Sequence, residues 1–141
     1  MHLRDVLEHK GRNVFSCTPD ESLEDVVHRL VDHNVGSLVV MEHGRMVGII
    51  TERDILRACH DGCAVLQREL VVDRMTLRPV SLSPEHDISE AMDLMTERRI
   101  RHLPVTDQEQ LLGIISIGDL VKAQQDELAR ENHYLKSYIQ S

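Results

Sequence analysis

The chain has 141 residues, about one ordinary domain, and a formal net charge of −8 at pH 7. That charge argues against DNA or RNA as the main partner, because binding a phosphate backbone needs a basic surface. Two tyrosines, one phenylalanine and no tryptophan leave little for stacking on single-stranded bases. No apolar run is long enough to cross a membrane, and no signal-peptide pattern follows Met1. Three cysteines form no disulfide framework, so we expect a cytoplasmic protein without a membrane partner.

The chain repeats itself. A shift of 65 residues places 14–58 on 79–123 without a gap, and the identical pairs include Gly48/Gly113 and Asp54/Asp119. Two copies of this length predict two equivalent half-domains. The expected division is a first repeat with a leading helix (1–60), a connector (61–78), a second repeat (79–123) and a C-terminal helix (124–141).

In chain order, a leading helix over 1–10 precedes the first copy. That copy begins with a short apolar strand at 14–16, and Thr18-Pro19 predicts a helix start, since a hydroxyl caps a helix and proline suits its first position. Two β-rich runs, 37–41 and 46–51, are separated by a hairpin turn.

A second helix follows each pair of strands. It opens at Thr51 in the first copy and at Ser116 in the second. The other counterparts in the second copy are a strand at 80–82, a helix start at Ser83-Pro84, and strands at 103–106 and 111–116. The fold class is therefore mixed α/β, with two β-α-β-β-α repeats. One copy is too small to cover its own sheet, so we expect the two to pack as a pseudo-two-fold pair, with an extended C-terminal helix beyond them.

The order of elements resembles a known family. A Gly-apolar-apolar-Thr/Ser-x-x-Asp signature occurs twice, and Arg99 to Val105 add a second family-like run. Together they are similar to a tandem cystathionine-β-synthase (CBS) domain pair, or Bateman module, of the stand-alone bacterial type. The resemblance implies a regulatory module that binds adenosine-containing ligands (AMP, ADP or ATP, also NAD or S-adenosylmethionine) between its repeats. It further implies a homodimer that acts on an unknown effector protein in trans.

The resemblance also implies site residues. Asp54 and Asp119 fall on the ribose-binding carboxylates, and Thr51 and Ser116 on the hydroxyls near ribose or phosphate. This chemistry is sensible, because a carboxylate accepts hydrogen bonds from ribose hydroxyls and a helix N-terminus offers free N–H groups to phosphate. Adenine is expected against the first strand of each repeat. The remaining expected contacts are Ser16, Ser37, Val80, Ser81, Arg53, Arg101 and His102.

The two clefts are not expected to be equivalent. The second repeat has Arg101-His102 where the first has Gly36-Ser37, and Arg53 is placed to reach a phosphate on a nucleotide held by Asp119. The Asp119 cleft is therefore predicted to be the better nucleotide site, and the Asp54 cleft to prefer adenosine or stay empty.

Structural roles stand beside these functional ones. A hydroxyl followed by an acid three residues later is also a plain capping box. Arg98, Arg99 and Arg101 can be a solvated helix end, and Arg53 can pair with a surface acid. Cys59 and Cys63 do not have zinc-site spacing, so no metal is expected, and Cys17 is expected to be a small buried residue.

Other functions remain open. No nucleophile elbow or phosphate loop supports an enzyme. The alternatives to nucleotide sensing are a ligand-free dimeric adaptor and a metal- or pH-responsive protein that uses the nine histidines. Leu128 and Leu135 at seven-residue spacing, with Tyr134 and Tyr138, predict that the C-terminal helix packs against a partner subunit; a frayed tail is the alternative.

Overall fold

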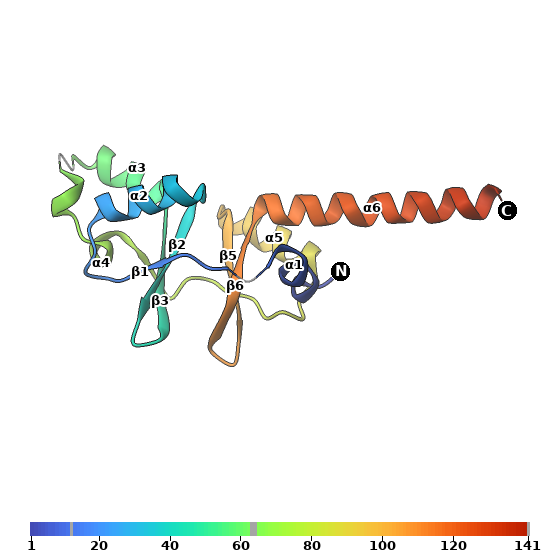
Figure 1. The fold of residues 1–141 in the computed structure, drawn as a ribbon, viewed down its shortest axis with the longest axis horizontal. Helices are drawn as coiled ribbons and strands as arrows, with labels where there is room; N and C mark the ends of the chain where they lie inside the picture. Colours follow the sequence, from blue (N-terminus) through green and yellow to red (C-terminus); the bar gives the residue numbers. More distant parts are fainter. Residues whose placement is uncertain (12, 63–64, 141) are drawn as a thin grey trace. The chain divides into compact units, whose positions relative to one another are not determined.

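The computed structural model of the chain describes residues 1–11, 13–62 and 65–140. It is a mixed α/β structure with two similar repeats and a long C-terminal helix (Figure 1). The elements in chain order are α1 (Leu3–Lys10), β1 (Ser16–Cys17), α2 (Leu23–His33), β2 (Ser37–Glu42), β3 (Arg45–Thr51), α3 (Glu52–His60), the short 3₁₀ helix η1 (Leu66–Arg68), α4 (Val71–Arg74), β4 (Thr76–Leu77), α5 (Ile88–Arg98), β5 (His102–Asp107), β6 (Gln110–Ser116) and α6 (Ile117–Gln140).

The chain forms two compact units, which are described separately. One unit comprises residues 1–12, 81–108 and 112–141, and is called the α6 unit below. The other comprises 13–80 and 109–111, and is called the β1–β4 unit. The leading helix α1 therefore belongs to the same unit as the second repeat.

The β1–β4 unit is built on a four-stranded sheet in the order β1-β2-β3-β4. The strands β2 and β3 form an antiparallel hairpin, and β1 lies parallel to β2. The turn residues of this hairpin, His43 and Gly44, both have positive φ, 53° and 77°, as a type I′ turn requires. Buried side chains of β2 and α2, including Leu38 and Leu23, join Ile50 in one core. The predicted hairpin is confirmed.

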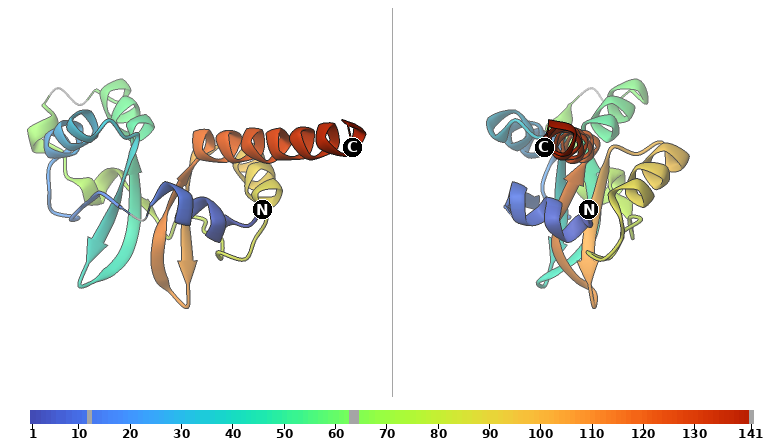
Figure 2. Two further views of the ribbon diagram at one scale, coloured as in Figure 1. Left: turned by 45° about the vertical axis from the view of Figure 1, so that its right-hand side comes forward. Right: turned by 90° about the vertical axis from the view of Figure 1, so that its right-hand side faces the viewer.

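The α6 unit repeats this plan with fewer strands. Its hairpin pairs β5 with β6, and Leu82 forms a parallel bridge to Val105 where the first repeat pairs Cys17 with Val40. The first turns of α6 pack against α1 and α5, and the rest of the helix extends beyond both of them (Figure 2). The second helix of this repeat and the predicted C-terminal helix are thus one continuous helix of 24 residues.

Both predicted starts of the first helices are wrong. The helix α2 begins at Leu23 with Ser22 as its cap, rather than at Thr18-Pro19, and α5 begins at Ile88 rather than at Ser83-Pro84. The reason is long-range pairing. The N–H of Leu23, which would donate to the carbonyl of Pro19 in a first helical turn, donates to the carbonyl of Glu69 at 3.0 Å, and the carbonyl of Pro19 accepts from the N–H of Val72 at 3.0 Å.

The same pairing governs the second repeat. There the N–H of Ile88, the i+4 donor to Pro84, donates to the carbonyl of Met1 at 3.1 Å, and the carbonyl of Pro84 accepts from the N–H of Arg4 at 2.9 Å. The first strands also differ from the prediction: β1 covers Ser16–Cys17 rather than 14–16, and its counterpart is the single bridge at Leu82.

Candidate functional site

The first candidate carboxylate, Asp54, lies at the N-terminus of α3. Its Oδ2 atom accepts a hydrogen bond from the backbone N–H of Thr51 at 2.8 Å and one from the Thr51 hydroxyl at 3.2 Å. Only 8% of Asp54 is exposed, and the chain turns from β3 into α3 at this point. The motif Thr51…Asp54 is therefore a real helix cap that holds a nearly buried carboxylate in a fixed orientation.

The second carboxylate, Asp119, lies at the equivalent place where β6 turns into α6. Its Oδ2 accepts from the backbone N–H of Ser116 at 2.9 Å, and its own N–H donates to the Ser116 hydroxyl at 3.1 Å. The two repeats thus build the same capped carboxylate from the same two positions.

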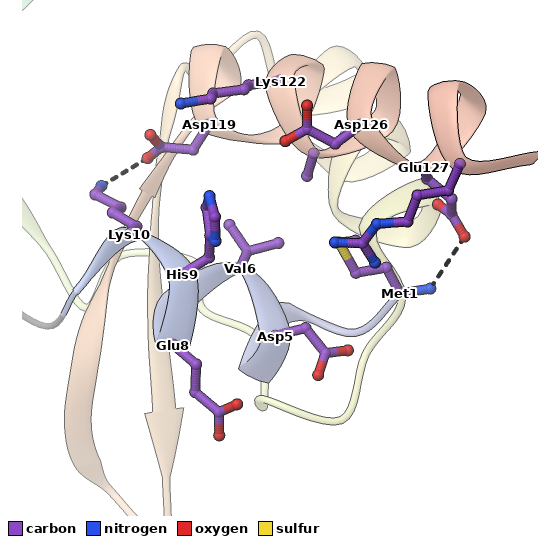
Figure 3. Close-up of a pocket in the computed structure, with 12 residues that line it drawn as sticks. Met1, Asp5, Val6, Glu8, His9, Lys10, Asp119, Lys122, Asp126 and Glu127 are labelled. Carbon is purple, nitrogen blue, oxygen red and sulfur yellow. Dashed lines mark hydrogen bonds and ion pairs between the residues drawn. The ribbon is translucent and has the colours of Figure 1, made fainter. Parts of the chain in front are cut away.

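Asp119 has a cation against it. The ammonium of Lys10, the last residue of α1, donates to Oδ2 of Asp119 at 2.6 Å (Figure 3). It also donates to the carbonyl of Ile114 at 2.7 Å. Burial raises the pKa of Asp119, but the hydrogen bonds and charge of Lys10, with the N–H of Ser116, outweigh it and hold the pKa below its ordinary value. The carboxylate is therefore ionised at neutral pH.

A cavity of about 950 Å³ lies between α1 and the first turns of α6. Its lining is mixed in charge: Figure 3 shows Lys10, Asp119 and Lys122 at one end and Met1 with Glu127 at the other. The volume is within the range of small-molecule pockets, about 300–1,000 Å³. Asp119 thus faces a space that can hold a small polar molecule.

The other predicted residues of the α6 unit lie around its hairpin. Arg101 has an exposed side chain, and its carbonyl accepts from the N–H of Ile117 at 2.9 Å. His102 begins β5 and is half-buried. The hydroxyl of Ser81 accepts from that of Thr106 at 3.3 Å. Their expected contacts with a nucleotide stay predictions.

In the β1–β4 unit, Ser16 pairs with Val39 and Ser37 pairs with Thr51 in the sheet. Val80 is half-buried and belongs to this unit, whereas Ser81 belongs to the other. The side chain of Arg53 is exposed at the start of α3. Arg53 and Asp119 belong to different units, so their expected joint contact with one nucleotide stays a prediction.

Sequence reasoning missed Lys10. The residue is 109 positions from Asp119, and it lies outside the segment that repeats. Its only signal in the sequence is its place at the end of the leading helix, where a basic residue is expected for reasons of helix polarity alone.

Two further properties concern residues 1–11, 13–62 and 65–140. No three histidine, cysteine, aspartate or glutamate side chains among them are grouped to hold a metal ion. No helix within these ranges has the length and hydropathy of a membrane span. Cys63, considered above with Cys59, lies outside the described residues.

Comparison with known proteins gives a consistent picture. The CBS domain family model matches twice, over residues 3–61 and 68–126. The mitochondrial CBS domain-containing protein CBSX3 of Arabidopsis thaliana is 38% identical in an alignment 147 residues long. The alignment covers 98% of this chain and 71% of the relative.

Two solved structures share the fold. A CBS-domain containing protein from Agrobacterium tumefaciens aligns with a TM-score of 0.85 and 37% identity, over 88% of this chain and 99% of that one. The crystal structure of CBSX2 in complex with AMP aligns with a TM-score of 0.72 and 25% identity, over 81% of this chain and 90% of that one.

Proposed function

The chain belongs to the CBS-domain family and holds two copies of the domain, and from this we propose that it is a regulatory module that binds an adenine nucleotide through Asp54 and Asp119. The observation that carries the proposal is the twofold occurrence of a capped carboxylate at a helix N-terminus, Asp54 with Thr51 and Asp119 with Ser116. An ionised carboxylate in this place accepts hydrogen bonds from ribose hydroxyls, and the helix N-terminus favours a phosphate nearby.

AMP is the first ligand to test, because the related CBSX2 was crystallised with it. ADP, ATP, NAD and S-adenosylmethionine share the adenosine group and form the comparison set. Binding regulates a partner only if the ligand has different affinities for two arrangements of the module. We propose that the effector is a separate protein that distinguishes those arrangements.

The test is calorimetric titration of AMP into the wild type, Asp54→Asn, Asp119→Asn and the double variant. Asparagine keeps the size and capping capacity of aspartate but removes the charge that strengthens hydrogen bonds from ribose. Hydrogen bonds to a charged group are worth about 1.5–3 kcal/mol each, so each site should weaken at least about tenfold. Asp93→Asn is the matched control, since Asp93 is an exposed aspartate in the middle of α5, caps no helix and does not line the cavity.

The double variant is expected to lose binding, and the control to keep it. If the double variant binds AMP as tightly as the wild type, the carboxylates are helix caps only. If no adenosine ligand raises the melting temperature of the wild type, the ligand-free adaptor is the better description, because a ligand that binds the folded state must stabilise it.

We also propose that the protein is a homodimer joined through α6. Val121, Leu128 and Leu135 recur every seven residues along this helix, and they are 40%, 54% and 54% exposed. Two helices with apolar residues at the same seven-residue spacing can pack together as a coiled coil. A second copy of this chain carries the same spacing and is therefore a suitable partner.

A further inference from the structure

The ammonium of Lys10 is held at Asp119 by two short hydrogen bonds from a helix that is itself firmly packed. Leu3 and Leu7 of α1 have no exposed surface, and Val6 has 5%. This packing fixes the helix that carries Lys10, and the ammonium of Lys10 bridges Asp119 to the carbonyl of Ile114 on β6. The contact is therefore a built part of the α6 unit.

Among residues 1–11, 13–62 and 65–140, no equivalent contact forms at Asp54, and the backbone shows why. Each repeat is covered by a segment that begins in the same way: Leu3 donates to the carbonyl of His86, and Val71 donates to that of Glu21, both at 2.9 Å. After this common start the segments diverge. The helix α1 continues to Lys10, whereas α4 ends at Arg74 and the chain extends into β4.

The consequence is an asymmetry between the two carboxylates. Lys10 reaches Asp119 because it stands on the last turn of a helix. Within the described ranges of the chain, Asp54 takes part in no ion pair, and the second group on its Oδ2 is the hydroxyl of Thr51, which can rotate away without separating charges.

The acceptor capacity of Asp119 then limits what it can bind. Each carboxylate oxygen accepts about two hydrogen bonds. Both positions on Oδ2 are taken, one by the N–H of Ser116 and one by Lys10. A ribose that uses both oxygens must displace one of these donors, and the backbone N–H of Ser116 is fixed by the helix cap. Lys10 is the donor that can leave.

We propose that Lys10 is a gate on Asp119: its ammonium occupies Oδ2, and a nucleoside whose ribose uses both carboxylate oxygens binds there only after displacing it. This inference rests on the proposed function of Asp119 in binding ribose. It gives the two sites different thresholds, with Asp54 filled at lower nucleoside concentration than Asp119. The sequence ranks the Asp119 site above the Asp54 site on the basis of Arg53, Arg101 and His102, without Lys10. For an uncharged nucleoside, the gate reverses that ranking.

Adenosine is the probe that isolates this effect, because it carries no charge that Lys10 can attract. The titration uses the full chain with Asp54→Asn, so that Asp119 is the reporting site, with Lys10 present or replaced in Lys10→Met. Methionine keeps an unbranched apolar stem and removes the ammonium. An exposed or half-exposed ion pair is worth up to about 1 kcal/mol, so adenosine should bind about two- to fivefold more tightly to the Lys10→Met protein.

Salt provides a second signature. Ions screen the Lys10–Asp119 pair, so the affinity for adenosine should rise between about 0.05 and 0.5 M NaCl when Lys10 is present and stay level in Lys10→Met. Lys10→Gln tests the same removal of charge with a polar side chain. Lys136→Met is the matched control, because Lys136 is an exposed lysine of α6 that does not line the cavity.

Each outcome decides the matter. Tighter binding in Lys10→Met and Lys10→Gln, with Lys136→Met unchanged, supports the gate. If both Lys10 variants bind adenosine as the parent does or more weakly, while Asp119→Asn still removes binding, the gate is wrong and the ribose role of Asp119 stands. If Asp119→Asn leaves adenosine binding intact, the ribose role fails and the gate fails with it.

Discussion

Cys17 is a buried thiol in β1, beside the strand position expected to contact adenine. Burial raises its pKa to about 12, and the charge of Glu21 adds to this, against a smaller opposite effect of Arg29. The thiolate is the reactive form of cysteine, so a thiol with this pKa is almost fully protonated at neutral pH. The side chain is therefore a packing residue, as its sequence context predicted.

This makes a direct prediction about labelling. Brief treatment of the native protein with iodoacetamide at neutral pH should modify Cys59, which is exposed, and leave Cys17 unmodified. Peptide mapping by mass spectrometry measures both positions in one sample. Unfolding in guanidinium before treatment is the control and should make both react. Equal labelling of the two in the native state would show that Cys17 is accessible and its pKa ordinary.

At the scale of single elements, the two repeats offer a matched comparison at Gly48 and Gly113. A Cβ atom at Gly48 would lie 2.7 Å from the backbone carbonyl oxygen of Thr76 and 2.9 Å from the sulfur of Met75. At Gly113 it would lie 2.7 Å from Cδ2 of Leu7, the far end of a side chain. Both repeats therefore need glycine at this position. The neighbour at Gly48 is backbone, which can move little, whereas the neighbour at Gly113 is the end of a side chain, which can move more.

We therefore expect Gly48→Ala to destabilise the protein more than Gly113→Ala. Overpacking costs about 1–3 kcal/mol, with the upper part of that range where the neighbour is backbone in a paired strand. The free energy of unfolding from urea denaturation, measured for both variants and the wild type, tests the order. Equal costs, or a larger cost at Gly113, would contradict it.

The helix α6 carries exposed apolar side chains, among them Leu128 and Leu135, each 54% exposed. Replacing Leu128 and Leu135 together by glutamate should convert a dimer into a monomer, because four negative charges would then meet along one seam of the two copies. Light scattering gives the mass directly. The control variant, His133→Glu with Ser137→Glu, places two glutamates on the opposite face of the helix and should leave the mass unchanged. A wild type that is monomeric at all concentrations would refute the proposed dimer.

Local signals made much of this fold predictable. The hairpin at His43-Gly44 and the helix openings at Thr51 and Ser116 depend on residues within a few positions of each other, and all three are confirmed. The helix starts at Thr18 and Ser83 were predicted wrongly because distant segments pair with those backbones. For the same reason no local pattern indicated the ion pair of Lys10 with Asp119.

At the scale of the whole molecule, the covering segments connect the chain in an unexpected order. The second repeat is covered by α1, which comes before the first repeat, whereas the first is covered by the connector through Val71 and Val72. Residues from the start of the chain and from its second half therefore form one core, and the stability of that unit depends on both.

This arrangement predicts where a core substitution is felt. Leu7 on α1 has no exposed surface, and Leu7→Ala should cost about 2–5 kcal/mol because it removes buried carbon and leaves a cavity. Since the two units are separately compact, the loss should fall mainly on the α6 unit. Hydrogen exchange should quicken in β5, β6 and α5, while β2 and β3 keep their protection.

Met75→Ala, on the covering segment of the other unit, should show the reverse pattern. Loss of protection spread evenly over both hairpins in both variants would mean that the chain unfolds as a single cooperative unit, and that the division into two does not govern its stability.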